Sequence, residues 1–288
     1  MANETRRVVV AGSGTMGSGI AQVAAGAGFS AILYDIAPEQ LERALQSIAH
    51  GLDRAVARGR VDASAKDATL NNLETTSDLS SACKDAEVFI EAIPERIELK
   101  LELFGRIEEH LPPRALVATN TSALSVTELA GALKNPARCI GLHFFNPVHR
   151  LKLVEVVRGL QTSDETNRIA LEFCRAIGKE TVEVNEAPGF VTTRVNALIG
   201  NEAFRMLQEG VASARDIDKA LKLGLNHPMG PFELVDLVGL DTRLSILRFL
   251  HEALGERFRP TYLQEQYVKS GRLGKKAGRG VYDYSEGD

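Results

Sequence analysis

Cysteine is scarce in this chain of 288 residues, which contains only Cys83, Cys139 and Cys174. The three are odd in number, lie far apart and form no Cys-x-x-Cys pair, so the sequence suggests neither a disulfide framework nor a zinc site. We therefore expect reduced thiols and no bound metal.

The sequence also lacks a surplus of positive charge and any long apolar segment. Its formal net charge is −4, so composition does not require the broad basic face that binds nucleic acid. No apolar run approaches the roughly 18 residues of a membrane span, and the polar residues 1–6 do not resemble a secretory signal. These absences predict a cytoplasmic protein with no nucleic-acid or membrane partner.

The first two thirds of the chain alternate between strand-like and helix-like segments. Helical patterns occur at 20–27, 38–57, 98–110 and 164–177. Buried-strand patterns separate them at 7–11, 31–35, 87–92, 116–119, 139–142, 153–157 and 180–184. This alternation predicts an α/β fold, a Rossmann-type, doubly wound and mostly parallel sheet.

Beyond residue 186 the pattern becomes helical throughout. Pro188-Gly189 interrupts the chain, and helices are expected around 196–204 and at 214–223 and 239–254. We therefore predict two domains, residues 1–186 and a smaller all-helical domain of residues 187–288. The helical domain is rich in Leu, Ile and Val, which favours burial at a subunit interface and predicts a homodimer.

A glycine-rich turn joins the first strand to the first helix. Gly12 permits a tight turn, Gly14 lets the backbone approach a pyrophosphate, and Gly17 lets helix and strand pack closely. A Gly-x-Gly-x-x-Gly motif alone is weak evidence, but its place between a strand and a helix is the one that dinucleotide binding requires. The expected pyrophosphate site at this helix N-terminus comprises Gly12, Ser13, Gly14, Thr15, Met16 and Gly17.

Asp35 closes the second strand, 18 residues after Gly17. This is near the spacing of about 20 expected for the acid that binds the adenosine ribose 2′-hydroxyl. Its carboxylate would repel a 2′-phosphate, and Ile36-Ala37 offers no arginine, which favours NAD over NADP. Asp35 has a structural alternative as the N-cap of the helix that begins near Pro38, and one residue can fill both roles.

Four polar segments adjoin predicted strand ends. Ligands of doubly wound sheets bind at the carboxyl edge of the strands, so side chains from these segments are expected to converge on one crevice. The segments are Glu91–Glu95 with Lys100, Asn120–Ser122, Gly141–Pro147 and Lys152–Glu155.

These segments carry a resemblance to the 3-hydroxyacyl-CoA dehydrogenase family that covers essentially the whole chain. The most telling motifs are His143-Phe-Phe-Asn-Pro147, Lys152-Leu-Val-Glu-Val156, His227-Pro-Met-Gly-Pro-Phe-Glu-Leu234 and the terminal Leu273–Tyr282. The resemblance implies NAD-dependent oxidation of an (S)-3-hydroxyacyl-CoA, such as 3-hydroxybutyryl-CoA, to the 3-oxoacyl-CoA, as in β-oxidation of fatty acids.

The resemblance also implies roles for individual residues. His143 is implied to be the catalytic base and Glu155 its partner. Ser122 and Asn146 are implied to hydrogen-bond substrate and cofactor. The resemblance also implies that Glu95 and Lys100 lie beside the nicotinamide.

The residue types suit this chemistry on their own terms. A base must take the hydroxyl proton as hydride leaves C3, and imidazole, with an ordinary pKa of about 6.5, can do so near neutrality. A carboxylate such as Glu155 on the other ring nitrogen fixes the tautomer and stabilises the imidazolium. Ser122 can donate to the oxygen as it becomes a carbonyl, and Asn146 can hold the cofactor carboxamide or an acyl oxygen. The structural alternatives are a core histidine for His143 and a helix-surface charge paired with Glu95 for Lys100.

Further residues are candidates for the substrate and cofactor. Arg54 and Arg58, four residues apart on one helix, could contact the phosphates of coenzyme A, and a solvated charged face is an equal alternative. Lys276 resembles a family position near the cofactor. The family usually has a substrate-contacting asparagine immediately before the arginine at 194, where this chain has Thr193, and Asn196 could supply the missing amide from one turn away.

Two other functions remain open from the sequence. A dehydrogenase of another β-hydroxy acid, such as a sugar acid, would use the same NAD domain and histidine. A non-enzymatic nucleotide-binding protein could retain the fold, although the presence of both His143 and Glu155 argues against it.

Overall fold

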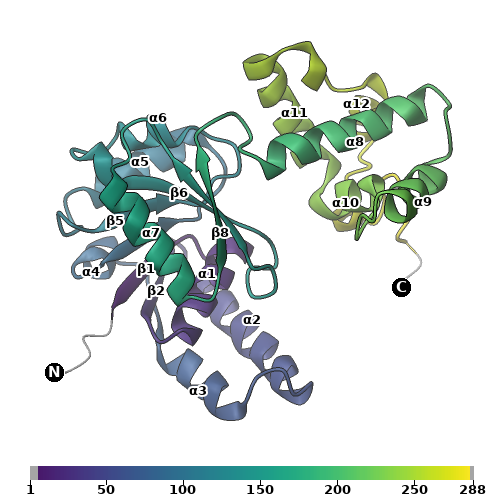
Figure 1. Ribbon diagram of the computed structural model, residues 1–288. Coiled ribbons are helices and arrows are strands. Elements are labelled where there is room, and N and C mark those ends of the chain that lie inside the picture. The colour runs from purple at the N-terminus through teal and green to yellow at the C-terminus, as the bar shows by residue number, and fades with distance from the viewer. Residues whose placement is uncertain (1–5, 286–288) are drawn as a thin grey trace. The chain divides into compact units, whose positions relative to one another are not determined.

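The computed structural model describes residues 6–285 and divides the chain into two compact units, Met1–Ala187 and Pro188–Asp288 (Figure 1). Most of the polar amino-terminal segment, residues 1–5, and residues 286–288 lie outside the described part. No helix within residues 6–285 is both long enough and apolar enough to cross a membrane.

An eight-stranded sheet forms the centre of the first unit, in the order β3-β2-β1-β4-β5-β6-β7-β8. Its strands are β1 Arg7–Ala11, β2 Ser30–Tyr34, β3 Leu73–Thr76, β4 Val88–Glu91, β5 Leu116–Thr119, β6 Cys139–Phe144, β7 Leu153–Arg158 and β8 Glu180–Asn185. Among these strands only the β6–β7 pair is antiparallel. The predicted mostly parallel, doubly wound sheet is therefore confirmed.

Helices follow most of the strands and cover the sheet. They are α1 Thr15–Gly26, α2 Pro38–Ala57, α3 Ala63–Asn71, α4 Leu79–Cys83, α5 Ile97–Ile107, α6 Val126–Ala130 and α7 Asp164–Ala176. In α2, Leu41, Ala44, Ile48 and Leu52 recur at spacings of three and four and are its buried residues, as an amphipathic helix requires.

Alternation along the strands decides which side chains share a face of the sheet. The main core lies on the face that carries Val88 and Ile90 of β4, and it includes apolar residues of α1, α2 and α7. Phe89 and Glu91 of β4 point to the opposite face. There the side chain of Lys100, on α5, meets Glu91. An acidic residue thus ends a strand that is otherwise apolar, on the α5 side.

The second unit is helical and has its own apolar core. Its helices are α8 Thr192–Gln208, α9 Ala214–Gly224, α10 Pro231–Val238, α11 Leu240–Leu254 and α12 Tyr262–Lys269. The rings of Phe204 and Phe232 pack edge to face with centroids 5.1 Å apart. Buried Asp218 accepts a hydrogen bond from the Tyr282 hydroxyl at 2.7 Å, which ties the carboxyl-terminal segment to α9.

The departures from the sequence prediction include an additional strand and an earlier helix start. The strand β3 was not expected, because only Leu73 of its four residues is buried and no run of apolar residues marks it. The first helix begins at Thr15, inside the glycine turn, rather than near Ile20. This earlier start places the turn's last residues on the helix itself.

Candidate active site

A histidine and a glutamate face each other across the antiparallel pair β6–β7. The register sets His143 opposite Glu155, and His143 Nδ1 lies 2.7 Å from Glu155 Oε2. The Glu155 side chain is fully buried, and that of His143 is 9% exposed. A buried carboxylate at Nδ1 favours the tautomer with its proton on that nitrogen and stabilises the imidazolium if the ring takes a second proton.

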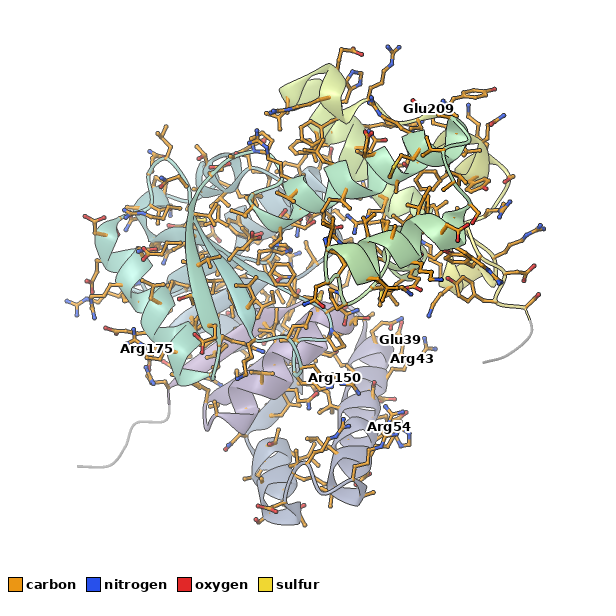
Figure 2. The ribbon with its side chains drawn as sticks, turned by 45° about the vertical axis from the view of Figure 1, so that its right-hand side comes forward. Glu39, Arg43, Arg54, Arg150, Arg175 and Glu209 are labelled. Atoms are coloured by element: carbon orange, nitrogen blue, oxygen red, sulfur yellow. The ribbon has the colours of Figure 1, made fainter. Side chains whose placement is uncertain are left out.

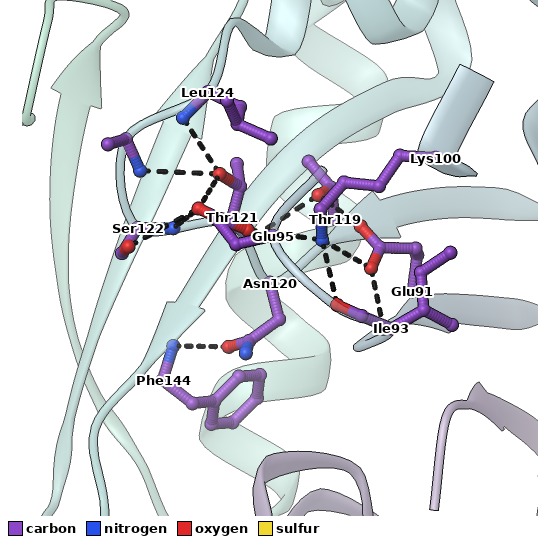
Figure 3. A network of polar contacts seen from close by, with 11 residues as sticks. Glu91, Ile93, Glu95, Lys100, Thr119, Asn120, Thr121, Ser122, Leu124 and Phe144 are labelled. Carbon is purple, nitrogen blue, oxygen red and sulfur yellow. Dashed lines mark hydrogen bonds and ion pairs between the residues drawn. The ribbon is translucent and has the colours of Figure 1, made fainter. Parts of the chain in front are cut away.

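The loop after β5 is tied to the strand that carries His143. Asn120 Oδ1 accepts a hydrogen bond from the backbone N–H of Phe144 at 2.9 Å (Figure 3). Asn120 N–H in turn donates to the carbonyl of Glu91 at 2.8 Å, so three neighbouring strand ends are fixed together. Ser122, two residues further on, therefore lies on a segment anchored to both neighbouring strands.

Glu95 holds the loop that carries Ser122. Its Oε1 accepts hydrogen bonds from Thr121 Oγ1 at 2.5 Å, Ser122 N at 2.9 Å and Ser122 Oγ at 3.3 Å. The structure thus brings together two of the sequence-predicted site residues, Glu95 and Ser122, in direct contact.

Lys100 is 1% exposed, so the alternative interpretation was wrong about a helix-surface position, although the pairing with Glu95 that it included is present. Its Nζ donates to Glu91 Oε1 at 2.5 Å and to the Ile93 carbonyl at 3.2 Å, and it lies 3.2 Å from Glu95 Oε2. Burial raises the pKa of the Glu91 carboxyl, and the Lys100 ammonium opposes that rise.

A cavity of about 690 Å³ opens at the point where the strand order reverses, between β1 and β4. This is the place where doubly wound sheets bind nucleotides, and the volume is in the range of ligand sites. Its lining combines the glycine turn, the end of β2, the segment after β4 and one side of α5, namely Gly12–Met16, Tyr34–Ala37, Gln40, Ala92–Pro94, Leu99, Glu102, Leu103 and Arg106.

Steric contacts explain the glycine turn. Gly12 has φ +102°, and a Cβ there would lie 2.6 Å from the Ala92 carbonyl oxygen. A Cβ at Gly17 would lie 1.8 Å from the Gly12 carbonyl oxygen, so only glycine lets the helix start this close to the strand. A Cβ at Gly14 would meet nothing within 4 Å, which leaves open space beside the helix N-terminus, as a bound pyrophosphate requires.

Asp35 contacts the glycine turn directly. Its Oδ2 accepts from Ser13 N and Ser13 Oγ, both at 2.7 Å, and its Oδ1 accepts from Ala37 N at 3.1 Å. The N-cap of α2 is Ala37, so the alternative interpretation of Asp35 as the helix cap is wrong. The carboxylate lines the larger cavity and connects β2 to the turn.

A smaller cavity of about 320 Å³ runs from the glycine turn along α2. It is lined by residues of the turn, by Gln40, Arg43 and Arg54, and by Asn146. Arg43 and Arg54 are eleven residues apart, which is about three helical turns, and lie along one side of α2 (Figure 2). Arg58, the C-cap residue of α2, is exposed and does not line this cavity.

Three predicted site residues belong to the second unit. Thr193 and Asn196 lie three residues apart near the start of α8 and are both partly buried. Lys276 Nζ donates to Asp241 Oδ2 at 2.7 Å. Their contacts with substrate or cofactor stay predictions.

Three residues of the first unit join these contacts without an individual role predicted from the sequence, although two of them lie in segments predicted to converge: Glu91, Thr119 and Asn120. Thr119 Oγ1 donates to Glu91 Oε2 at 2.6 Å in the buried interior. The available signal was an ionisable residue at the end of the apolar strand Val88–Glu91. Its meaning depends on Lys100, which sequence spacing alone does not place beside it.

Comparison with known proteins identifies the family of this chain. Residues 7–187 match the family model described as 3-hydroxyacyl-CoA dehydrogenase, NAD binding domain, and residues 189–284 match that of its C-terminal domain. A probable 3-hydroxybutyryl-CoA dehydrogenase of Bacillus subtilis is 46% identical over 98% of this chain and 99% of its own length. A 3-hydroxyadipyl-CoA dehydrogenase of Escherichia coli is 44% identical over 96% of this chain, which spans 58% of that protein.

Solved structures show the same likeness. The crystal structure of (S)-3-hydroxybutyryl-CoA dehydrogenase from Ralstonia eutropha has a TM-score of 0.94 and 38% identity, over 98% of this chain and all of that one. The chain therefore belongs to the 3-hydroxyacyl-CoA dehydrogenase family and is an NAD-dependent oxidoreductase.

Proposed function

We propose that this protein oxidises the 3-hydroxyl of a short (S)-3-hydroxyacyl-CoA, reversibly, with 3-hydroxybutyryl-CoA as its substrate. The observation that carries the proposal is the buried His143–Glu155 pair, with 2.7 Å between Nδ1 and Oε2, near the carboxyl end of β6 in an NAD-binding domain. The names of the similar proteins from Bacillus subtilis and Ralstonia eutropha support the choice of acyl group.

Residues of the first unit fit NAD. The N–H groups of the turn from Gly12 to Gly17 would hold the pyrophosphate, and Asp35 the adenosine ribose. A carboxylate offers about four acceptor positions, and three are used within the chain, so Asp35 can accept one more hydrogen bond. NAD, when bound, supplies the hydride acceptor.

His143 and Glu155 act on the proton of the substrate hydroxyl. As hydride leaves C3, the hydroxyl proton would pass to His143 Nε2, and the substrate would become the C3 carbonyl compound. Glu155 stabilises the positive charge that then forms on the ring. The Ser122 hydroxyl has one proton, which would turn from Glu95 Oε1, at 3.3 Å, to the substrate oxygen. Asn146 holds a carboxamide or acyl oxygen, and Arg54 contacts coenzyme A phosphate.

A substrate panel tests this proposal. Initial rates with NAD are compared for 3-hydroxybutyryl-, 3-hydroxyhexanoyl- and 3-hydroxyadipyl-CoA, and for free 3-hydroxybutyrate and a sugar acid. We expect kcat/KM to be highest for 3-hydroxybutyryl-CoA and the free acids to be poor substrates. Comparable kcat/KM for a free hydroxy acid would contradict the proposal, and a preference for the adipyl thioester would correct its acyl group.

We also propose a homodimer formed through the helical unit and a location in the cytoplasm. Several large apolar side chains of that unit are exposed, among them Leu223 at 77% and Leu225 at 66%. Exposed apolar area of this kind commonly marks an interface. The cytoplasm agrees with three free, buried cysteines. A light-scattering mass of twice 31.2 kDa is expected, and the monomer mass would refute the dimer.

A further inference from the structure

The Glu91 carboxylate joins three elements of the first unit. Its Oε1 accepts from Lys100 Nζ at 2.5 Å and from Ile93 N at 2.7 Å, and its Oε2 accepts from Thr119 Oγ1 at 2.6 Å (Figure 3). Glu91 ends β4, Thr119 ends β5 and Lys100 lies on α5. A fully buried carboxylate that accepts three hydrogen bonds has little freedom to move.

Lys100 links the buried Glu91 carboxylate to Glu95. An ammonium has three protons, and three oxygen atoms surround this one, on Glu91, Ile93 and Glu95. The Glu95 side chain is 40% exposed, whereas that of Lys100 is 2% exposed. Lys100 thus connects the buried interior to a partly exposed carboxylate.

Glu95 uses its two carboxylate oxygens for different partners. Oε2 faces Lys100, and Oε1 holds Thr121 and both polar groups of Ser122. Thr121 Oγ1 also accepts from Leu124 N at 2.8 Å, which closes the loop. Release of Glu95 from Lys100 would therefore loosen the loop that carries Ser122.

Stability alone does not account for a buried ion pair of this kind. Replacing such a pair by apolar side chains of similar volume often leaves a protein as stable or makes it more stable. Here a buried charge orients a partly exposed carboxylate, that of Glu95. This arrangement is better explained by the need to hold Thr121 and Ser122, the residues that Glu95 binds, in a fixed position.

We propose that Glu91 and Lys100 are positioning residues, which act through Glu95 to hold the backbone of Ser122, so that its hydroxyl can reach the substrate oxygen. The inference rests on the proposed function for the role of Ser122, and the hydrogen-bonded series itself is independent of the substrate.

A double-mutant cycle tests the kinetic part. Glu91→Gln removes the charge and keeps the shape, and we expect kcat on 3-hydroxybutyryl-CoA to fall at least tenfold, with the Kd of NADH changed less than threefold. If Glu91 acts through Ser122, the variant Glu91→Gln with Ser122→Ala is no slower than Ser122→Ala alone, because coupled residues are not additive. Independent, multiplying effects would overturn the proposal.

The matched control is a buried carboxylate pair of this unit that has no proposed part in the reaction. Glu108 Oε2 lies 2.6 Å from Arg138 Nη2, with side chains 10% and 7% exposed. Glu108→Gln is expected to lower the Tm as Glu91→Gln does but to leave kcat within twofold. A matching loss of kcat in Glu108→Gln would show that Glu91→Gln acts through general destabilisation.

Two further measurements keep the test decisive. If Glu91→Gln does not fold, Glu91→Leu with Lys100→Met replaces the pair by apolar side chains, and wild-type kcat in that variant would overturn the proposal. Hydrogen exchange needs no substrate. The amides of residues 121–124 should exchange faster in Glu91→Gln than in the wild type, and at the wild-type rate in Glu108→Gln. Unchanged exchange there refutes the positioning series, whereas inactivity of the wild type on every acyl-CoA refutes only the proposed function.

Discussion

Asp35 allows a quantitative test of cofactor choice. Its carboxylate is held by Ser13 and Ala37 and lines the nucleotide cavity. The perturbation is Asp35→Asn, which removes the negative charge while keeping an oxygen that can accept from Ser13. Any change in cofactor preference then reports mainly the charge.

The expected size follows from Coulomb's law. A 2′-phosphate on the ribose that Asp35 binds would lie about 5 Å from the carboxylate, and two unit charges at that distance with an effective dielectric constant of about 20 repel by about 3 kcal/mol. That energy corresponds to a factor of roughly 200. We expect wild-type kcat/KM to favour NADH over NADPH by at least about 100-fold, and Asp35→Asn to narrow the gap by about tenfold or more.

The assay is reduction of acetoacetyl-CoA with each nucleotide in turn, followed by loss of the reduced cofactor's absorbance. Asp85→Asn is the matched control, because Asp85 pairs with Arg7 at the opposite end of β1 from the glycine turn. Equal efficiency of the wild type with NADPH and NADH would refute the reasoning. So would an equal shift of preference in the two variants.

Three further results are expected. Arg54→Ala should raise the KM of the acyl-CoA about tenfold, since a charge-assisted hydrogen bond is worth about 1.5 to 3 kcal/mol. Arg58→Ala should change this KM less than twofold, and equal effects of the two substitutions would show that the cavity along α2 is not the coenzyme A site. Thr193→Ala should lower kcat/KM by up to about tenfold and Asn196→Ala at least as much, and wild-type kinetics for Asn196→Ala would exclude its amide from the site. Burial raises the pKa of the three thiols, Cys83, Cys139 and Cys174, to about 12. A thiol reagent at mildly alkaline pH should therefore modify none of them in the native protein and all three after unfolding. The stability of the fold should also fall as pH rises from the ordinary thiol pKa towards about 12, because in that range only the unfolded chain loses its thiol protons.

Much of the fold could be predicted because buried parallel strands leave a strong apolar signal. The run Val8–Ala11, buried on both faces, and the glycine turn after it predicted a strand, a turn and a helix. The edge strand β3 has no such signal, because it buries only Leu73.

The direction of β7 also had a signal that apolar patterning does not report. Only residues 145–152 separate β6 from β7, and a crossover between parallel strands needs a dozen or more residues. Chain length between the two strands therefore favours the antiparallel pair that sets His143 opposite Glu155.

The candidate site was less predictable from residue patterns alone. His143 and Glu155 were identified by family resemblance, whereas their contact depends on strand register. The signal at Glu91 was an ionisable residue at the end of an apolar strand, but its role depends on the partners that the fold brings to it. Lys100 lies nine residues further along the chain, and its burial follows from the packing of α5 on the sheet.

The central claim is that His143, held by Glu155, removes the proton of the substrate hydroxyl. The most direct measurement compares kcat and the Kd of NADH in His143→Ala and Glu155→Gln, with His251→Ala as the control, since His251 also lies near a glutamate, Glu256, at 3.0 Å, but in the second unit and at the surface. We predict that kcat falls by about 100- to 10,000-fold in His143→Ala and also falls in Glu155→Gln, that NADH binding changes little, and that the control keeps its activity. A His143→Ala enzyme that retains turnover within a few-fold of the wild type would contradict the account.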